Sequence, residues 1–125
     1  MTAAEQPGCV LIVDDNLEYA ENIAEILAID GWSTHVAGSA EEALSVALAA
    51  EFNILLTDFR LPGMNGVELI KTMLRQDLKP VSIVMTAYAS EETESFARKV
   101  GARLLHKPVD LPGLNQLIRD EQGSA

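Results

Sequence analysis

The sequence contains a single cysteine and no long hydrophobic run among its 125 residues. One thiol, Cys9, excludes an internal disulfide and favours a reducing compartment, and its place in an apolar run predicts a buried side chain. The longest apolar runs, such as VLIV, are far shorter than the roughly 20 residues of a membrane-spanning helix. The first residues, MTAAEQPG, lack the basic start and apolar core of a signal peptide. We therefore expect a cytoplasmic protein without membrane contact.

Basic residues are also scarce, because 9 lysines and arginines stand against 19 aspartates and glutamates, a formal net charge of −10. Such a surface repels phosphate backbones and anionic lipids. We expect no direct nucleic-acid binding by this chain. If it regulates genes, another protein or domain has to contact the DNA. The acidic excess instead favours bound cations.

Short apolar runs alternate with amphipathic segments along the chain, which is 48% hydrophobic and 22% charged. The runs predict strands over residues 9–13, 33–36, 53–57, 81–86 and 102–106, and helices are indicated after Asn16, Ser39, Asn65, Ser90 and Asp110. This alternation predicts one α/β domain over residues 8–120, with loose termini at 1–7 and 121–125. Its core is a doubly wound, five-stranded parallel sheet with helices on both faces.

Polar side chains stand where the predicted strands end: Asp14 and Asp15 after the first, Asp58 after the third, Thr86 at the end of the fourth and Lys107 after the fifth. Ligands of open α/β sheets bind outside these carboxyl ends. Each residue has an ordinary explanation, such as a solvated loop, a turn cap or a surface lysine. Their coincidence at four strand ends favours a functional site.

The chemistry of this site follows from its charges. Three neighbouring carboxylates repel one another unless a cation intervenes, and oxygen ligands with an incoming phosphate suit Mg²⁺. A carboxylate such as Asp58 can act as the nucleophile of phosphoryl transfer and become an aspartyl phosphate. Lys107 would neutralise charge on the phosphoryl oxygens, and Thr86 would hydrogen-bond the product.

The motifs LIVDDN, TDFRLPGMNG, MTAYAS and HKPVD, in this order and spacing, resemble those of a response regulator receiver domain of two-component signalling, of the kind found in chemotaxis regulators. The resemblance implies a flavodoxin-like strand order 2-1-3-4-5. It also implies that a sensor histidine kinase or a histidine phosphotransfer protein donates a phosphoryl group to Asp58 in the presence of Mg²⁺. The chain would be a switch that assists its own phosphorylation and dephosphorylation, not a turnover enzyme.

The resemblance assigns four residues to the metal and the phosphoacceptor. Asp58 matches the phosphoacceptor and a metal ligand, Asp15 the direct metal ligand, and Asp14 the acidic neighbour that reaches the ion through water. The backbone carbonyl of Arg60 matches the remaining protein ligand, so its basic side chain need not touch the metal.

The resemblance assigns three further residues to the phosphoryl group. Thr86 matches the switch hydroxyl, and the backbone N–H of Ala87 lies next to the phosphate in the family. Lys107 matches the phosphate-binding lysine, and its peptide bond to Pro108 is cis in the family.

The chain departs from the family at Leu104, where an aromatic residue usually moves inward on activation. Tyr88 is a different position, close behind Thr86, where its ring could shield the acyl phosphate from water. We expect Leu104 to stay buried in both states and the loop that follows Thr86 to carry the output. A face formed by residues 91–118 would then bind a partner or a second copy of the chain.

The sequence disfavours three alternative functions. A haloacid-dehalogenase-like phosphatase would want a second Asp at position 60, where this chain has Arg60. A degenerate receiver that only docks is disfavoured because all five active-site side chains are present. A flavin-binding flavodoxin is disfavoured because no phosphate-binding loop rich in Ser, Thr and Gly follows the first predicted strand of this chain. No output domain is expected in this chain, so both a stand-alone regulator and a receiver of a longer protein fit it.

Overall fold

The structure, a computed structural model, describes residues 8–123. Within them five strands alternate with five helices: β1 (Cys9–Val13), α1 (Leu17–Ile29), β2 (Ser33–Ala37), α2 (Ala40–Ala49), β3 (Ile54–Asp58), α3 (Gly66–Arg75), β4 (Val81–Thr86), α4 (Glu91–Lys99), β5 (Arg103–His106) and α5 (Leu111–Gly123). All four strand pairings are parallel, in the order β2-β1-β3-β4-β5. The predicted doubly wound sheet is confirmed.

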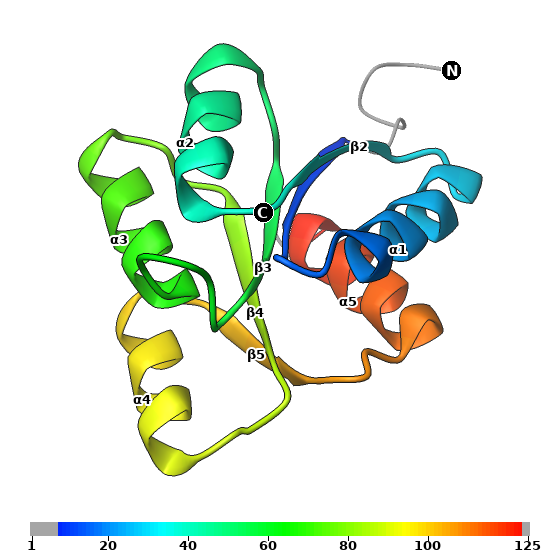
Figure 1. Cartoon of the computed structure of the whole chain (residues 1–125). Coiled ribbons are helices and arrows are strands. Elements are labelled where there is room, and N and C mark those ends of the chain that lie inside the picture. Colours follow the sequence, from blue (N-terminus) through cyan, green and yellow to red (C-terminus); the bar gives the residue numbers. More distant parts are fainter. Residues whose placement is uncertain (1–7, 124–125) are drawn as a thin grey trace.

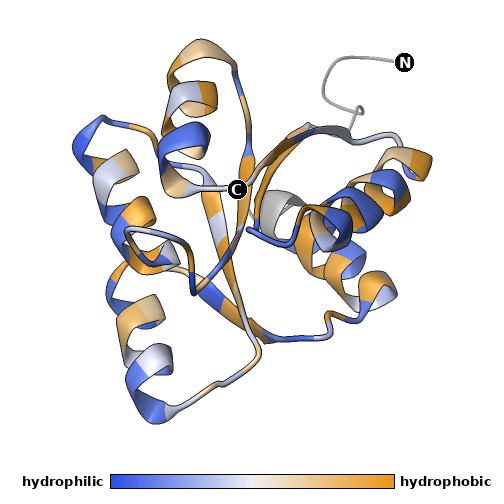
Figure 2. Cartoon of the chain, viewed as in Figure 1, coloured by the Kyte–Doolittle hydropathy of each residue, from blue (hydrophilic) through white to orange (hydrophobic). Residues whose placement is uncertain are grey.

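The sheet separates two hydrophobic layers (Figure 1). Helices α1 and α5 cover one face, and α2, α3 and α4 cover the other. Alternate residues of a strand point to opposite faces, so Val10 and Ile12 join the α1–α5 layer while Leu11 and Val13 join the other. Figure 2 shows the helices with hydrophobic and hydrophilic residues intermixed along their length, as expected for helices with one face on a sheet and one in solvent.

Side chains are most completely buried at the centre of the sheet. Every residue of β3 is buried, whereas β5 lies at an edge and its burial is incomplete. Leu104 is consequently half-buried against the α2–α4 layer rather than buried as predicted. Cys9, at the beginning of β1, is also only partly buried, because the start of the strand lies at the end of the layered core.

All five helices begin where the sequence predicts, directly after Asn16, Ser39, Asn65, Ser90 and Asp110, and the first four of these residues cap their helices through their side chains. Asn16, Ser39, Asn65 and Ser90 each accept a hydrogen bond at the helix N-terminus from the backbone N–H three residues on. At Asn65 the cap is reciprocal, because the Glu68 carboxylate accepts the Asn65 N–H. At Ser39 it is not, because Glu42 accepts the N–H of Gly38 instead. These caps fix the helix starts close to the carboxyl ends of the strands.

The last helix is longer than predicted. α5 continues to Gly123, past the predicted domain end at residue 120, because Asp120, Glu121 and Gln122 include no helix breaker. The other residues predicted to be loose, 1–7 and 124–125, lie outside the described residues. Among the described residues, no helix has both the length and the hydrophobicity needed to cross a membrane.

Candidate functional site

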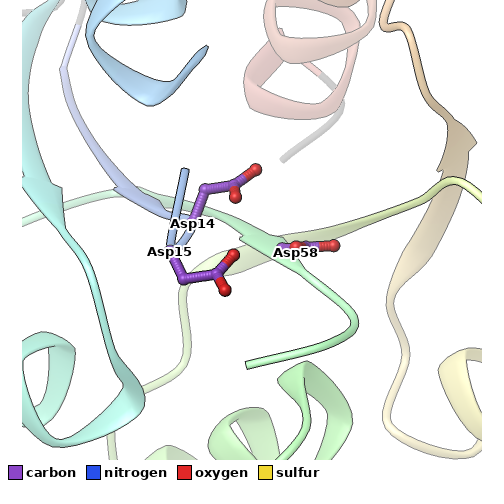
Figure 3. Close-up of side chains that lie close together, drawn as sticks. All are labelled: Asp14, Asp15 and Asp58. Atoms are coloured by element: carbon purple, nitrogen blue, oxygen red, sulfur yellow. The ribbon is translucent and has the colours of Figure 1, made fainter. Parts of the chain in front are cut away.

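Three carboxylates meet at the carboxyl ends of the two central strands (Figure 3). Asp14 and Asp15 follow β1, Asp58 ends the adjacent strand β3, and one oxygen from each lies within 4.8 Å of the others. Asp14 has no exposed surface and Asp58 is 8% exposed, whereas Asp15 is open to solvent. The predicted acidic site is therefore assembled, with one carboxylate accessible and two largely enclosed.

Lys107 brings a positive charge into this cluster. Its ammonium lies 2.7 Å from an Asp14 oxygen and 3.4 Å from an Asp58 oxygen. Its backbone N–H donates to the Thr86 carbonyl at 2.8 Å, which continues the β4–β5 pairing into the loop. The following peptide bond, Lys107–Pro108, is cis, as the family resemblance implies.

Burial and charge set the protonation of the two central groups. The pKa of Asp58 is raised, first by burial and then by the negative charge of Asp14, against the opposing effect of Lys107 and a hydrogen bond from the Arg60 backbone. Burial would lower the pKa of Lys107, but hydrogen bonding to Asp14 and the charges of both carboxylates outweigh it and raise the pKa. The lysine therefore stays charged at neutral pH, beside an Asp58 carboxyl that ionises less readily than usual.

The backbone around Asp58 is held by several main-chain contacts. The N–H of Phe59 donates to the Met85 carbonyl at 2.7 Å, and the N–H of Gly66 donates to the Phe59 carbonyl at 2.7 Å. A Cβ atom at Gly66 would lie 2.5 Å from the Asp58 carbonyl oxygen. The first residue of α3 therefore packs directly on the peptide that carries Asp58, which only glycine permits.

The predicted switch residues lie on the β4–α4 side of the site. Thr86 is buried, and its hydroxyl accepts the N–H of Tyr88 at 3.1 Å. Ala87 and Tyr88 are exposed, and the Arg60 guanidinium stacks over the Tyr88 ring at 5.6 Å from its centroid. This contact joins the β3–α3 and β4–α4 loops above the rim of the sheet. Sequence reasoning missed it, because it considered Arg60 only through its backbone.

A second missed residue is Tyr19, in the first turn of α1. The Lys107 ammonium lies 4.8 Å from the centroid of its ring, and its hydroxyl accepts the N–H of Val109 at 2.9 Å. The sequence could have pointed to Tyr19 only through its position. It lies four residues after Asp15, about one helical turn from the rim where the carboxylates stand.

The donor set suits a small, hard dication. Asp14, Asp15 and Asp58 offer carboxylate oxygens around a common space, with Asp15 facing solvent, as Mg²⁺ requires if it is to keep several waters.

Comparison with known proteins agrees with this arrangement. The family model for the response regulator receiver domain matches residues 10–119. A response regulator receiver protein of Anaeromyxobacter sp. is 41% identical over 108 residues, which are 86% of this chain and 45% of that protein. Sporulation initiation phosphotransferase F of Bacillus subtilis is 30% identical over 112 residues, 88% of this chain and 90% of that protein. The chain thus spans under half of the first relative and nearly all of the second.

Solved structures show the same fold. A CheY-like response regulator receiver domain protein from Methanospirillum hungatei superposes with a TM-score of 0.89 at 30% identity, covering 95% of this chain and 96% of that one. The likeness therefore extends over the sheet, all the helices that cover it and the rim where the carboxylates lie.

Proposed function

Because this chain belongs to the response regulator receiver domain family, we propose that Asp58 accepts a phosphoryl group from a phosphohistidine donor. The observation that carries the proposal is the position of the Asp58 carboxylate. It lies at the end of a buried strand, beside the carboxylates of Asp14 and Asp15, and 3.4 Å from the Lys107 ammonium. An Asp58 oxygen attacks the phosphorus, a P–O bond forms as the P–N bond breaks, and the electron pair of that bond remains on the imidazole nitrogen.

Charge compensation is divided between the lysine and a metal ion. Lys107 is held beside both enclosed carboxylates and would neutralise the phosphoryl oxygens once they arrive. Asp14, Asp15, Asp58 and the Arg60 carbonyl would hold Mg²⁺, which supplies positive charge to the transferred group. Asp15 is the exposed member, so it would contact the ion directly, while buried Asp14 is engaged by Lys107.

Signal output would begin at Thr86. Its hydroxyl already accepts the N–H of Tyr88, but still has its own hydrogen to donate to a phosphoryl oxygen. The N–H of Ala87, next along the loop, would be a second donor. The added charge of about −1.5 to −2 draws Thr86 toward Asp58 and with it the loop that leads into α4.

The partners follow from this chemistry. The phosphodonor is a sensor histidine kinase or a histidine phosphotransfer protein. The output surface is formed by α4, β5 and α5, where a partner or a second copy would bind; α4 and α5 lie on opposite faces of the sheet beside the edge strand β5. The chain acts as a switch that assists its own modification and its reversal.

Phosphorylation can be tested with a small donor. Incubation with acetyl phosphate and Mg²⁺ should add one phosphoryl mass that alkaline treatment removes, and chelation should prevent it. Asp58→Asn should not acquire the mass, whereas the matched surface variant Asp30→Asn should behave as wild type. A label that persists in Asp58→Asn, or that forms equally under chelation, contradicts the proposal.

A further inference from the structure

Lys107 contacts a residue, Tyr19, that the chemistry of phosphoryl transfer does not itself require. The ammonium sits at the end of a flexible four-carbon stem whose rotational freedom must be restricted for it to act at one place. Oxygens of Asp14 and Asp58 lie 2.7 Å and 3.4 Å from the ammonium. The centroid of the Tyr19 ring lies 4.8 Å from it, within the range of a favourable cation–π contact.

Tyr19 also holds the backbone of the same segment. Its hydroxyl accepts the N–H of Val109 at 2.9 Å, two residues beyond the lysine. A single side chain thus contacts both the charged group of Lys107 and the main chain that follows it. Few side chains could do both, because the ring has to lie under the ammonium while the hydroxyl reaches the loop.

Tyr19 is itself firmly placed. Its own N–H donates to the Asn16 side chain at 3.1 Å in the cap of α1, and its ring packs against the hydrophobic layer under α1 and α5. Asn16 in turn donates its N–H to Asp14 at 3.0 Å. The start of α1 is therefore tied to the buried carboxylate and, through Tyr19, to the lysine that this carboxylate binds.

We propose that Tyr19 is a positioning residue for Lys107: it holds the ammonium between Asp14 and Asp58, where a phosphoryl group on Asp58 would meet it. This inference rests on the proposed phosphoacceptor function of Asp58. Tyr19 would act without contacting the phosphoryl group or the metal, because its contacts in this region are with Lys107, Val109 and Asn16. Its effect passes through the lysine, so it disappears when the lysine is removed.

The decisive experiment is a double-mutant cycle with the phosphoryl analogue beryllofluoride and Mg²⁺. Tyr19→Leu removes the ring, Tyr19→Phe keeps it, and each is made with Lys107 and with Lys107→Met. With Lys107 present, Tyr19→Leu should weaken beryllofluoride binding about three- to tenfold, the range of a cation–π contact, while Tyr19→Phe retains most of the affinity. With Lys107→Met, Tyr19→Leu should change the affinity no further.

A control for the loss of an aromatic ring is available at the opposite end of the sheet. Phe52 lies just before β3, packed against the α2–α4 layer and away from the carboxyl ends of the strands, so Phe52→Leu removes a ring remote from the carboxylates. It should leave beryllofluoride affinity unchanged, and thermal unfolding should show that every variant is folded. An equal loss from Tyr19→Leu in both lysine backgrounds, or no loss in either, overturns the proposal.

A spectroscopic measurement on the metal-free protein separates this inference from the proposed function. The Tyr19 ring current should shift the Lys107 side-chain NMR signals upfield in wild type and Tyr19→Phe, and Tyr19→Leu should abolish the shift. If wild type fails to bind beryllofluoride, the proposed function is wrong, and the ring-current comparison still decides whether Tyr19 holds Lys107. Lysine signals that are identical in wild type and Tyr19→Leu overturn the inference by themselves.

Discussion

The Lys107 ammonium lies closer to Asp14 than to Asp58, at 2.7 Å against 3.4 Å. Asp14 has no exposed surface, so the lysine is the charge that compensates a carboxylate which water cannot reach. Removal of the lysine would leave the buried Asp14 charge uncompensated, which lowers the free energy of unfolding even though the lysine itself is partly exposed. The lysine thus stabilises the resting fold as well as serving the proposed chemistry.

Lys107→Met should therefore lower the free energy of unfolding of the metal-free protein by about 1–3 kcal/mol. Because a bound dication would replace the missing charge, Mg²⁺ should restore part of this loss and bind more tightly than to wild type. Denaturant unfolding with and without Mg²⁺ measures both effects. The matched variant Lys71→Met, at an exposed position of α3, should change neither. Equal stability of Lys107→Met and wild type would contradict the compensation argument.

Asp58→Asn should stabilise the metal-free protein by about 1 kcal/mol at neutral pH, several degrees in Tm for a domain of this size. Burial and the Asp14 charge raise the pKa of Asp58, so the folded state binds this proton more tightly than the unfolded state. Stability therefore falls as the pH rises from the ordinary carboxyl pKa through the raised value. The advantage of Asp58→Asn should be small at about pH 3 and grow toward about pH 7.

Thermal unfolding in the presence of a chelator, measured across this pH range, tests the direction in which the stability difference changes with pH. Asp30→Asn is the control for an exposed aspartate. An advantage of Asp58→Asn that shrinks as the pH rises would mean that Lys107, not burial, dominates the ionisation of Asp58.

Metal binding should separate the two neighbouring aspartates. Asp15 is exposed, so Asp15→Asn should weaken Mg²⁺ binding at least tenfold with a stability change within about 0.5 kcal/mol. Asp14 is buried and accepts from both Lys107 and the Asn16 N–H, so Asp14→Asn should cost stability as well as affinity. Titration calorimetry with Mg²⁺ and chelated unfolding curves distinguish the two. Undiminished Mg²⁺ binding in Asp15→Asn would place the metal elsewhere.

The Arg60–Tyr88 contact should affect the lifetime of the phosphorylated state. The stacked pair joins two loops over the rim, so Tyr88→Ala should open the acyl phosphate to water and shorten its half-life severalfold. Arg60→Gln keeps the backbone carbonyl proposed for the metal but removes the stacked cation, and should have a smaller effect in the same direction. Loss of phosphorylated protein with time, followed by intact mass, measures this; an unchanged or longer half-life in Tyr88→Ala contradicts shielding.

The positions of the acidic residues could be predicted from sequence because they depend on strand ends. Asp14, Asp15 and Asp58 each follow or close a short apolar run, and parallel strands bring their carboxyl ends together whatever the side-chain details. The caps at Asn16 and Asn65 could also be predicted, because each involves residues only three positions apart. To predict such features, it is enough to know the periodicity of an element and the residue at its end.

Contacts between side chains of distant elements could not be predicted in this way. The approach of Lys107 to Tyr19 joins residues 88 positions apart and depends on how the β5–α5 loop folds back over α1. The Leu104 side chain was expected to be buried because it is apolar, but its exposure depends on β5 lying at the sheet edge. Likewise, Leu17 repeats at helical spacing with Ala20 but is 49% exposed, since the apolar stripe of α1 is wider than the face that meets the sheet.

The glycine that begins α3 has a mechanical consequence. Gly66 packs on the Asp58 peptide, and both the N–H and the carbonyl of Phe59 are hydrogen-bonded, so the proposed phosphoacceptor is held on a stiff segment of backbone. Across the rim, the β4–α4 loop is held by side-chain contacts, namely the hydrogen bond from the Tyr88 N–H to the Thr86 hydroxyl and the stacking of Arg60 on the Tyr88 ring. The two sides of the site therefore differ in how easily they move. We expect Asp58 to stay in place during phosphorylation and nearly all of the displacement to appear in the β4–α4 loop. The signal would then leave the site in one direction.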